Sequence, residues 1–154
     1  MNKEIASQPD AGKFRSIATI ILILICIAAF LRYTDHLSAK VEIIARDRVI
    51  SDIKHSLAMM LYDYTIKGQK RGLRKFDLEN PFVPLAIYRS LPANYRGVAV
   101  DLRVDETEGW YFVKKSKRLV FISKKGNRQY FLMRYIVENN VGRLKLERIA
   151  QGTS

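Results

Sequence analysis

The strongest constraint on the fold is an apolar block at residues 16–31, which holds no charged side chain over 16 positions. As an α-helix, the block covers roughly 24 Å, a little less than the hydrocarbon core of a bilayer. Arg15 and Arg32 flank it, and arginine stems can lie along lipid while their charged heads reach the interface. The sequence therefore predicts a transmembrane helix over 16–32, preceded by a short N-terminal tail at 1–15.

A cleaved signal peptide is the main alternative for this block. It would also begin with basic residues and an apolar core, but it needs small residues at the first and third positions before the cut. Cys26, Ile27 and Ala28 meet that need loosely, and cleavage there would fall inside the apolar block. We therefore expect an uncleaved anchor. Lys and Arg lie on both sides of the block, so the charge count leaves its orientation open.

The helical pattern continues beyond the block, because no Gly or Pro occurs between Arg32 and Gly68. Apolar residues recur there at steps of mostly three and four, which is typical of an amphipathic helix. The sequence predicts that helix over 33–68, continuous with the membrane helix and ending at Gly68 as a C-cap. Its stripe needs an apolar partner, either another helix or the rest of this chain, and packing on its own domain is favoured for 50–64. The stripe consists of Leu37, Val41, Ile44, Ile50, Ile53, Leu57, Met60, Leu61 and Tyr64.

The remainder of the chain is predicted to be an irregular segment at 69–109 followed by a sheet at 110–150. Three prolines interrupt the first segment, apart from a short strand pattern at 98–104. In the second, strand-like runs alternate with short turns, which favours an antiparallel meander. A long helix can cover the apolar face of such a sheet, so the expected fold class is α+β with two layers. The expected strands are 109–113, 118–123, 128–139 and 143–149.

The sequence offers no sign of an enzyme or of a bound cofactor. It has no phosphate-binding glycine loop, nucleophile elbow, zinc-protease motif or dinucleotide fingerprint. Cys26 is the only cysteine, and His36 and His55 have no Cys or His neighbour at ligand spacing, so no metal site is expected. We therefore expect a non-enzymatic protein with no cofactor and no metal.

The chain is strongly basic, with a formal net charge of +12. Residues 33–154 hold 23 Lys or Arg against 13 Asp or Glu, a net charge of +10, so the excess lies outside the membrane block. A solvated basic surface is the simpler interpretation, and the alternative is a module that binds anionic lipid or nucleic acid. Nucleic acid is the less favoured ligand, because the nearby aromatic residues have apolar neighbours rather than the setting of exposed stacking platforms. The cations concerned are Lys114, Lys115, Lys117, Arg118, Lys124, Lys125 and Arg128.

Three motifs carry a resemblance to a known family: "ENPFVPL" at 79–85, "LPANYRG" at 91–97 and "GWYFVKKSKRLVFIS" at 109–123. Together with the order of helix and sheet, they resemble pilins and pseudopilin-like accessory proteins of type IV pili and type II secretion systems. The likeness is strongest to the F-type biogenesis proteins of the mannose-sensitive haemagglutinin (MSHA) pilus. The candidate structural or partner-contact residues are Asn80, Pro81, Phe82, Asn94, Tyr95, Gly97, Trp110, Tyr111 and Phe112. Because side chains alternate along a strand, Trp110 and Phe112 are expected in the core and Tyr111 on the exposed face.

The sequence departs from the pilin pattern at the processing site. Prepilins carry Gly followed by Phe-Thr-Leu-Ile-Glu, whereas Lys13 separates Gly12 from Phe14 here, and no glutamate lies within 14–31. This difference argues against prepilin-peptidase processing and against entry into the filament. The resemblance then implies a single-pass, pilin-shaped assembly component in the bacterial inner membrane, with its sheet domain in the periplasm. Its partners would be pilus or secretion assembly proteins and inner-membrane lipid, with homo- or hetero-oligomers formed through the long helix.

Overall fold

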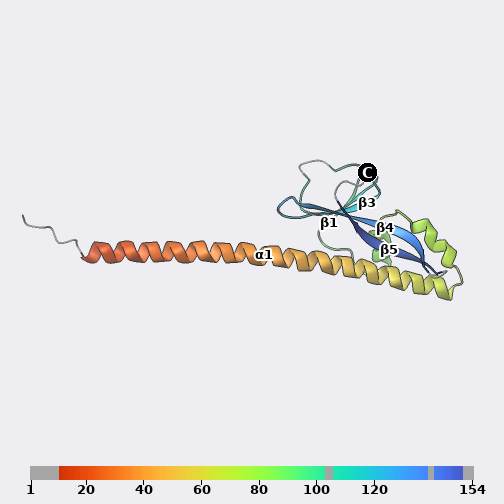
Figure 1. Cartoon of the computed structure of the whole chain (residues 1–154), viewed down its shortest axis with the longest axis horizontal. Coiled ribbons are helices and arrows are strands. Elements are labelled where there is room, and N and C mark those ends of the chain that lie inside the picture. The colour runs from red at the N-terminus through yellow and green to blue at the C-terminus, as the bar shows by residue number, and fades with distance from the viewer. Residues whose placement is uncertain (1–10, 103–105, 139–140, 151–154) are drawn as a thin grey trace, which may run out of the picture. The chain divides into compact units, whose positions relative to one another are not determined.

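The computed structural model describes residues 11–102, 106–138 and 141–150. In chain order it contains the helix α1 (Ala11–Ile66), the 3₁₀ helix η1 (Lys70–Phe76), the short helix α2 (Phe82–Tyr88) and five strands (Figure 1). The strands are β1 (Tyr95–Ala99), β2 (Gly109–Val113), β3 (Arg118–Ile122), β4 (Arg128–Glu138) and β5 (Val141–Ile149). A long helix packed on a mixed five-stranded sheet is an α+β arrangement, so the predicted fold class is confirmed at that level.

Helix α1 is one continuous helix of 56 residues, which confirms the predicted continuity between the apolar block and the amphipathic segment. It ends as the sequence predicts. Gly68 has a φ of +68°, a left-handed conformation that glycine adopts without steric cost. The Gln69 N–H donates to the Tyr64 carbonyl at 2.8 Å, and the Gly68 N–H donates to the Thr65 carbonyl at 3.1 Å. These two bonds form a Schellman motif, which satisfies the last carbonyls of the helix.

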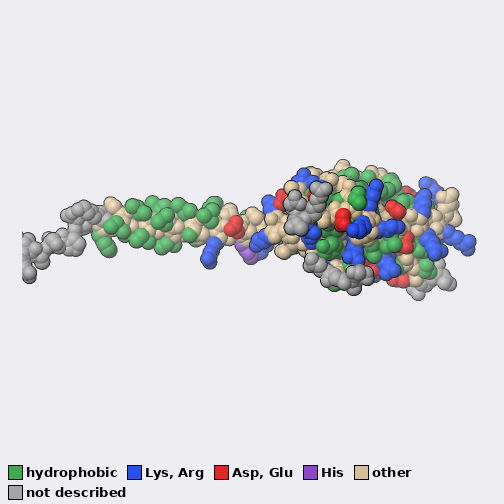
Figure 2. Space-filling model, turned by 90° about the horizontal axis from the view of Figure 1, so that it is seen from above, with side chains coloured by type: hydrophobic (Ala, Val, Ile, Leu, Met, Phe, Trp, Pro, Cys, Tyr) green, Lys and Arg blue, Asp and Glu red, His purple; other side chains and the backbone are tan. Residues whose placement is uncertain are grey.

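The chain divides into two compact units, residues 1–43 and 44–154. In the described part of the first unit, the apolar side chains of the 16–31 block are exposed all along the helix, as Ile21, Leu24 and Phe30 illustrate. Figure 2 shows hydrophobic side chains covering the visible surface of this segment. By length and composition, α1 could cross a membrane once. The boundary at residue 43 lies inside the segment predicted as the amphipathic helix 33–68.

In the second unit, the C-terminal part of α1 supplies one layer and the sheet supplies the other. Ile53, Leu57 and Met60 are buried and belong to the main core cluster, together with residues from β2 to β5. Their positions follow steps of three and four, so they lie on one face of the helix. Packing of residues 50–64 on the chain's own domain is therefore confirmed. Leu37, Val41 and Ile44, the earlier residues of the same stripe, are exposed.

The strand order is β1-β2-β3-β4-β5, and the four strands from β2 to β5 pair antiparallel, as the short turns predict. The prediction of an entirely antiparallel sheet is wrong at one edge, because β1 pairs parallel to β2. Parallel neighbours cannot be joined by a tight turn, so the chain must cross from the end of β1 back to the start of β2. Residues 100–102 and 106–108 are the described part of this connection.

The segment 69–109, predicted to be irregular, contains η1, α2 and β1. The strand expected at 98–104 is also misplaced: β1 spans Tyr95–Ala99, and residues 103 and 104 lie outside the described ranges. The prolines explain part of the difference. Pro81 lies directly before α2 and Pro84 lies near its start, positions where the missing N–H costs no hydrogen bond.

Both faces of the central strands are buried. A second, smaller core cluster holds Tyr111, Val113, Val120 and Ile122, with Leu102 of the connection packed against it. The expectation that Tyr111 is exposed is therefore wrong, since only 6% of its surface is accessible. Side-chain alternation does place Tyr111 on the face opposite Trp110, but the β1–β2 connection contributes to covering that face.

Candidate partner-contact site

The three sequence motifs meet at one place in the second unit. Tyr95 of β1 pairs with Trp110 of β2 in the parallel register, and the Trp110 N–H donates to the Asn94 carbonyl at 2.9 Å. Phe82 at the start of α2 completes the group: its ring centroid lies 4.4 Å from that of Tyr95 and 5.9 Å from that of Trp110. Residues from three segments that are distant in the sequence thus form one aromatic cluster.

Asn80 links the polar atoms of this cluster. Its side-chain amide donates to the Tyr95 hydroxyl at 3.0 Å, and its side-chain carbonyl accepts the Phe82 N–H at 3.0 Å. The second bond satisfies an N–H in the first turn of α2, which has no partner within the helix. Asn80 is only 8% exposed, and a buried amide without such partners would be costly. Asn80 therefore positions α2 against β1.

Trp110 is the centre of the main core. Its side chain is completely buried, and its ring lies 4.9 Å from Phe121 and 5.7 Å from Phe131, measured between centroids. The indole Nε1–H is buried without a hydrogen-bond partner among the described residues. An N–H group that leaves water without gaining a partner costs free energy on folding. This N–H therefore offsets part of the stability that burial of the ring contributes.

A side-chain contact also ties α2 to α1. The Tyr88 hydroxyl donates to an Asp63 carboxylate oxygen at 2.6 Å. Partial burial and this hydrogen bond raise the pKa of Tyr88 to about 12, since both disfavour the phenolate. An ion pair at 2.9 Å links Asp52 of α1 to Arg89, the residue directly after α2. Two side-chain contacts therefore hold the C-terminal end of α2 against α1.

The candidate residues predicted from the sequence differ in where the structure places them. Asn80, Phe82, Asn94, Tyr95 and Trp110 lie together, with Pro81 buried beside Phe82 in the sequence. Tyr111 lies on the opposite face of the sheet, and its hydroxyl bonds to Thr107. Phe112 is buried and pairs with Leu119, whereas Gly97 is partly exposed in β1. Most of these side chains are buried within the domain, and their role in partner contact stays a prediction.

The basic residues singled out from the sequence do not form one continuous run in space. Lys114, Lys115 and Lys117 lie in the turn before β3, and Lys124 and Lys125 lie in the turn after it. These turns are at opposite ends of a five-residue strand, which separates them by roughly 15 Å. Lys115 also pairs with Asp101 at 2.9 Å, a contact that raises the pKa of Lys115 and lowers the pKa of Asp101.

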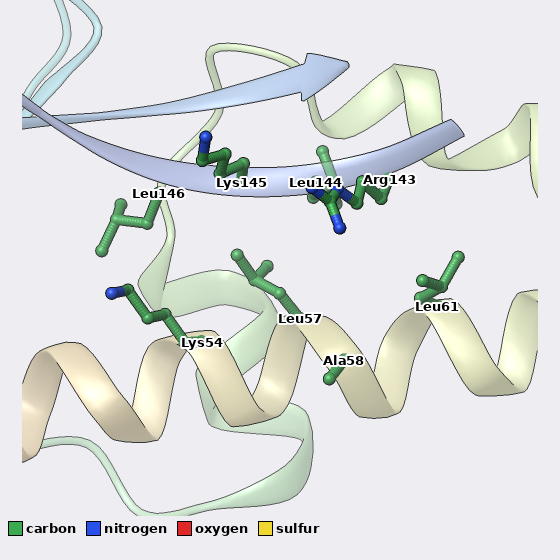
Figure 3. A pocket seen from close by; sticks show the side chains of 8 residues that line it. All are labelled: Lys54, Leu57, Ala58, Leu61, Arg143, Leu144, Lys145 and Leu146. Atoms are coloured by element: carbon green, nitrogen blue, oxygen red, sulfur yellow. The ribbon is translucent and has the colours of Figure 1, made fainter. Parts of the chain in front are cut away.

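A groove that the sequence did not predict lies in the second unit, between α1 and β5. Its volume is about 380 Å³, and its lining combines leucines with Lys54, Arg143 and Lys145 (Figure 3). The alternation of leucines and charges in 143–149 was visible in the sequence, but the position of that strand beside α1 was not. No three His, Cys, Asp or Glu side chains come close enough to hold a metal ion within the described ranges.

Comparisons with protein-family models, curated proteins and solved structures found no match for this chain.

Proposed function

We propose that this protein is a non-enzymatic, membrane-anchored component for the assembly of a type IV-like pilus of the MSHA kind or of a related secretion pseudopilus. The observation that carries the proposal is the single helix α1. Its N-terminal part exposes an apolar surface long enough to cross a membrane, and its C-terminal part forms the helical layer of an α+β unit. The resemblance to pilin-like accessory proteins predicts this sequence of elements.

The three motifs that carry the resemblance also support the proposal. They lie far apart in the sequence, and Asn80, Tyr95 and Trp110 from the three motifs belong to one hydrogen-bonded aromatic cluster. A shared structural role gives a physical reason why the motifs would occur together in one family. The remaining exposed surface and the anchor are then available for contacts with pilin-like partners, and no catalytic residues are required.

In this proposal the protein stays in the inner membrane, with the second unit in the periplasm. The 16–31 block lacks the glutamate that pilins use within the filament, so the helix would hold the protein beside the assembly machinery. Within the membrane, the apolar part of α1 would pack beside the membrane helices of partner proteins. The second unit would contact partners outside the cytoplasm.

A reporter fusion tests this topology. We expect an alkaline phosphatase domain fused after Ser154 to be active, because that enzyme works only outside the cytoplasm. The matched control is a green fluorescent protein fusion at the same residue, which should be dark when exported through the general secretion route. A dark phosphatase fusion and a bright fluorescent fusion, both intact and abundant, would contradict the proposal. That result would instead favour a cytoplasmic basic module that binds anionic lipid.

We also expect the mature protein to keep residues 1–31 and to remain in the membrane after washing with alkaline carbonate. The physical reason is the exposed apolar surface of the 16–31 block, because transferring that surface from lipid into water costs free energy. N-terminal sequencing and immunoblotting of the washed membranes measure both points. A variant with Ile21→Arg and Leu24→Arg serves as control and should appear in the wash, since each central arginine costs about 3 kcal/mol in a membrane helix. Cleavage after Ala28 would rule out the anchor.

A further inference from the structure

Strand β5 forms one edge of the sheet. It pairs with β4 along Val141–Ile149, and no other strand pairs with it in the described part of the chain. Such an edge directs alternate N–H and C=O groups away from its neighbour, and these groups can pair with an added strand. The side chains of β5 follow the same period of two: Leu144 and Leu146 are buried, whereas Arg143 and Lys145 are exposed.

The groove beside this edge has an apolar floor. Leu57 and Leu61 of α1 face Leu144 and Leu146 of β5 across it, and Lys54 lies at one end (Figure 3). Its volume of about 380 Å³ falls within the range of ligand-binding clefts. The groove therefore offers contact area for apolar side chains directly next to unpaired backbone groups.

The rim of the groove is positively charged. Lys54 has no ion-pair partner among the described residues, and Lys145 reaches Glu147 only at 3.6 Å. Arg143 pairs with Glu138, and Arg148 lines a smaller depression that shares Lys54 and Leu146 with the groove. The groove and this depression are thus lined by five cations and one acid, Asp47, which pairs with Arg46 at 2.7 Å. The five cations are Lys54, Arg143, Lys145, Arg46 and Arg148. A partner that enters the groove gains most if it carries negative charge.

We propose that β5 and the groove bind an extended segment of another protein, which adds to the sheet as a further strand and alternates acidic with apolar side chains. The apolar side chains would contact Leu57, Leu61 and Leu146. The acidic ones, on the other face of the added strand, would lie beside Lys145 and Arg143, and Lys54 at one end of the groove adds to the positive charge that attracts them. A second copy of this chain fits poorly, because its own β5 carries the same positive charges. A lipid could fill the groove but could not pair with the backbone of β5. This inference holds whether or not the partner belongs to a pilus.

The test uses the full-length protein in nanodiscs of phosphatidylcholine. The probe is a synthetic peptide in which Glu alternates with Val, matched in length to β5. We expect it to bind, and we expect hydrogen exchange of the outward-facing amides within 141–149 to slow. A double variant, Lys54→Glu with Lys145→Glu, should weaken binding about tenfold or more, because both reversed charges would repel the peptide. The same peptide N-methylated along one edge should not bind, since it cannot pair with β5.

The matched control is a second double variant, Lys114→Glu with Lys125→Glu, which changes the net charge equally at turns away from the groove. Its affinity for the peptide should stay close to that of the unmodified protein. Equal weakening in both double variants would show general charge attraction and overturn the proposal, as would peptide binding without slower exchange in β5. Slower exchange in β5 on adding phosphatidylglycerol to the discs, with no effect of the peptide, would make the groove a lipid site and also overturn it.

Discussion

Replacing Trp110 with alanine is expected to lower the free energy of unfolding of the second unit by about 3–5 kcal/mol. The indole is completely buried, and three aromatic rings surround it with centroid distances between 4.9 and 5.9 Å. The cavity left by the substitution would open at the junction of α2, β3 and β4, where these rings support one another. Urea denaturation of a soluble fragment covering residues 33–154, followed by circular dichroism, measures the change.

Trp110→Phe is the matched control for this prediction. It keeps an aromatic ring against Phe82 and Phe121 but removes the buried indole N–H that has no partner among the described residues. Leaving such a group unpaired costs about 1–3 kcal/mol, so its removal offsets part of the lost packing. We therefore expect a much smaller loss of stability than for alanine. An unchanged midpoint in Trp110→Ala would contradict burial of the ring and would make Trp110 a candidate surface for partner contact.

The parts of the fold that follow local patterns could be predicted from the sequence. The continuity of α1 follows from the absence of Gly and Pro between Arg32 and Gly68, and its end follows from the conformational freedom of Gly68. The meander from β2 to β5 follows from short turns between apolar runs, because a tight turn permits only antiparallel neighbours. In each case, residues close in the sequence decide the structure.

The parallel pairing of β1 with β2 could not be predicted, because it depends on contacts between distant segments. The strand Tyr95–Ala99 is short and half-exposed, and its sequence does not show which neighbour it joins. The same contact explains the error at Tyr111. Alternation correctly places it opposite Trp110, but Leu102 of the β1–β2 connection packs against that face. The alternation of side chains along a strand predicts which face of the sheet a residue lies on, but it does not predict which other segments cover that face.

The candidate site was predicted as a set of residues without its geometry. The three motifs named Asn80, Tyr95 and Trp110, but only the fold shows that α2, β1 and β2 bring them into one cluster. The groove beside β5 was missed for the same reason. Its leucines and lysines come from two elements separated by most of the domain's sequence. The sequence therefore shows which side chains are present, but it does not show which of them contact one another in the fold.

Gly109→Ala is expected to destabilise the second unit by at least about 2 kcal/mol, although it adds only one methyl group. Gly109 has a φ of +140°, which side chains rarely allow, and a Cβ there would lie 2.5 Å from the Asn94 carbonyl oxygen. That oxygen accepts the Trp110 N–H at 2.9 Å, so moving it away would break the hydrogen bond between β2 and the residue directly before β1. The parallel pairing and the aromatic cluster depend on the same close approach. Urea denaturation of the fragment 33–154 measures the loss, and the fluorescence of Trp110 should shift if its surroundings open.

Gly126→Ala is the control for Gly109→Ala. It tests how much stability an alanine costs through its positive φ alone, without overlap between the added Cβ and another atom. Gly126 also has a positive φ, +78°, but a Cβ there would meet no atom within 4 Å. Its substitution should therefore cost only about 1 kcal/mol, from the left-handed conformation alone, and should leave the fluorescence of Trp110 unchanged. If both alanine variants lost the same stability, contact with Asn94 would not be what fixes glycine at position 109. A Gly109→Ala protein as stable as the unmodified one would show that the Asn94 carbonyl does not lie as close to Gly109 as the structure places it.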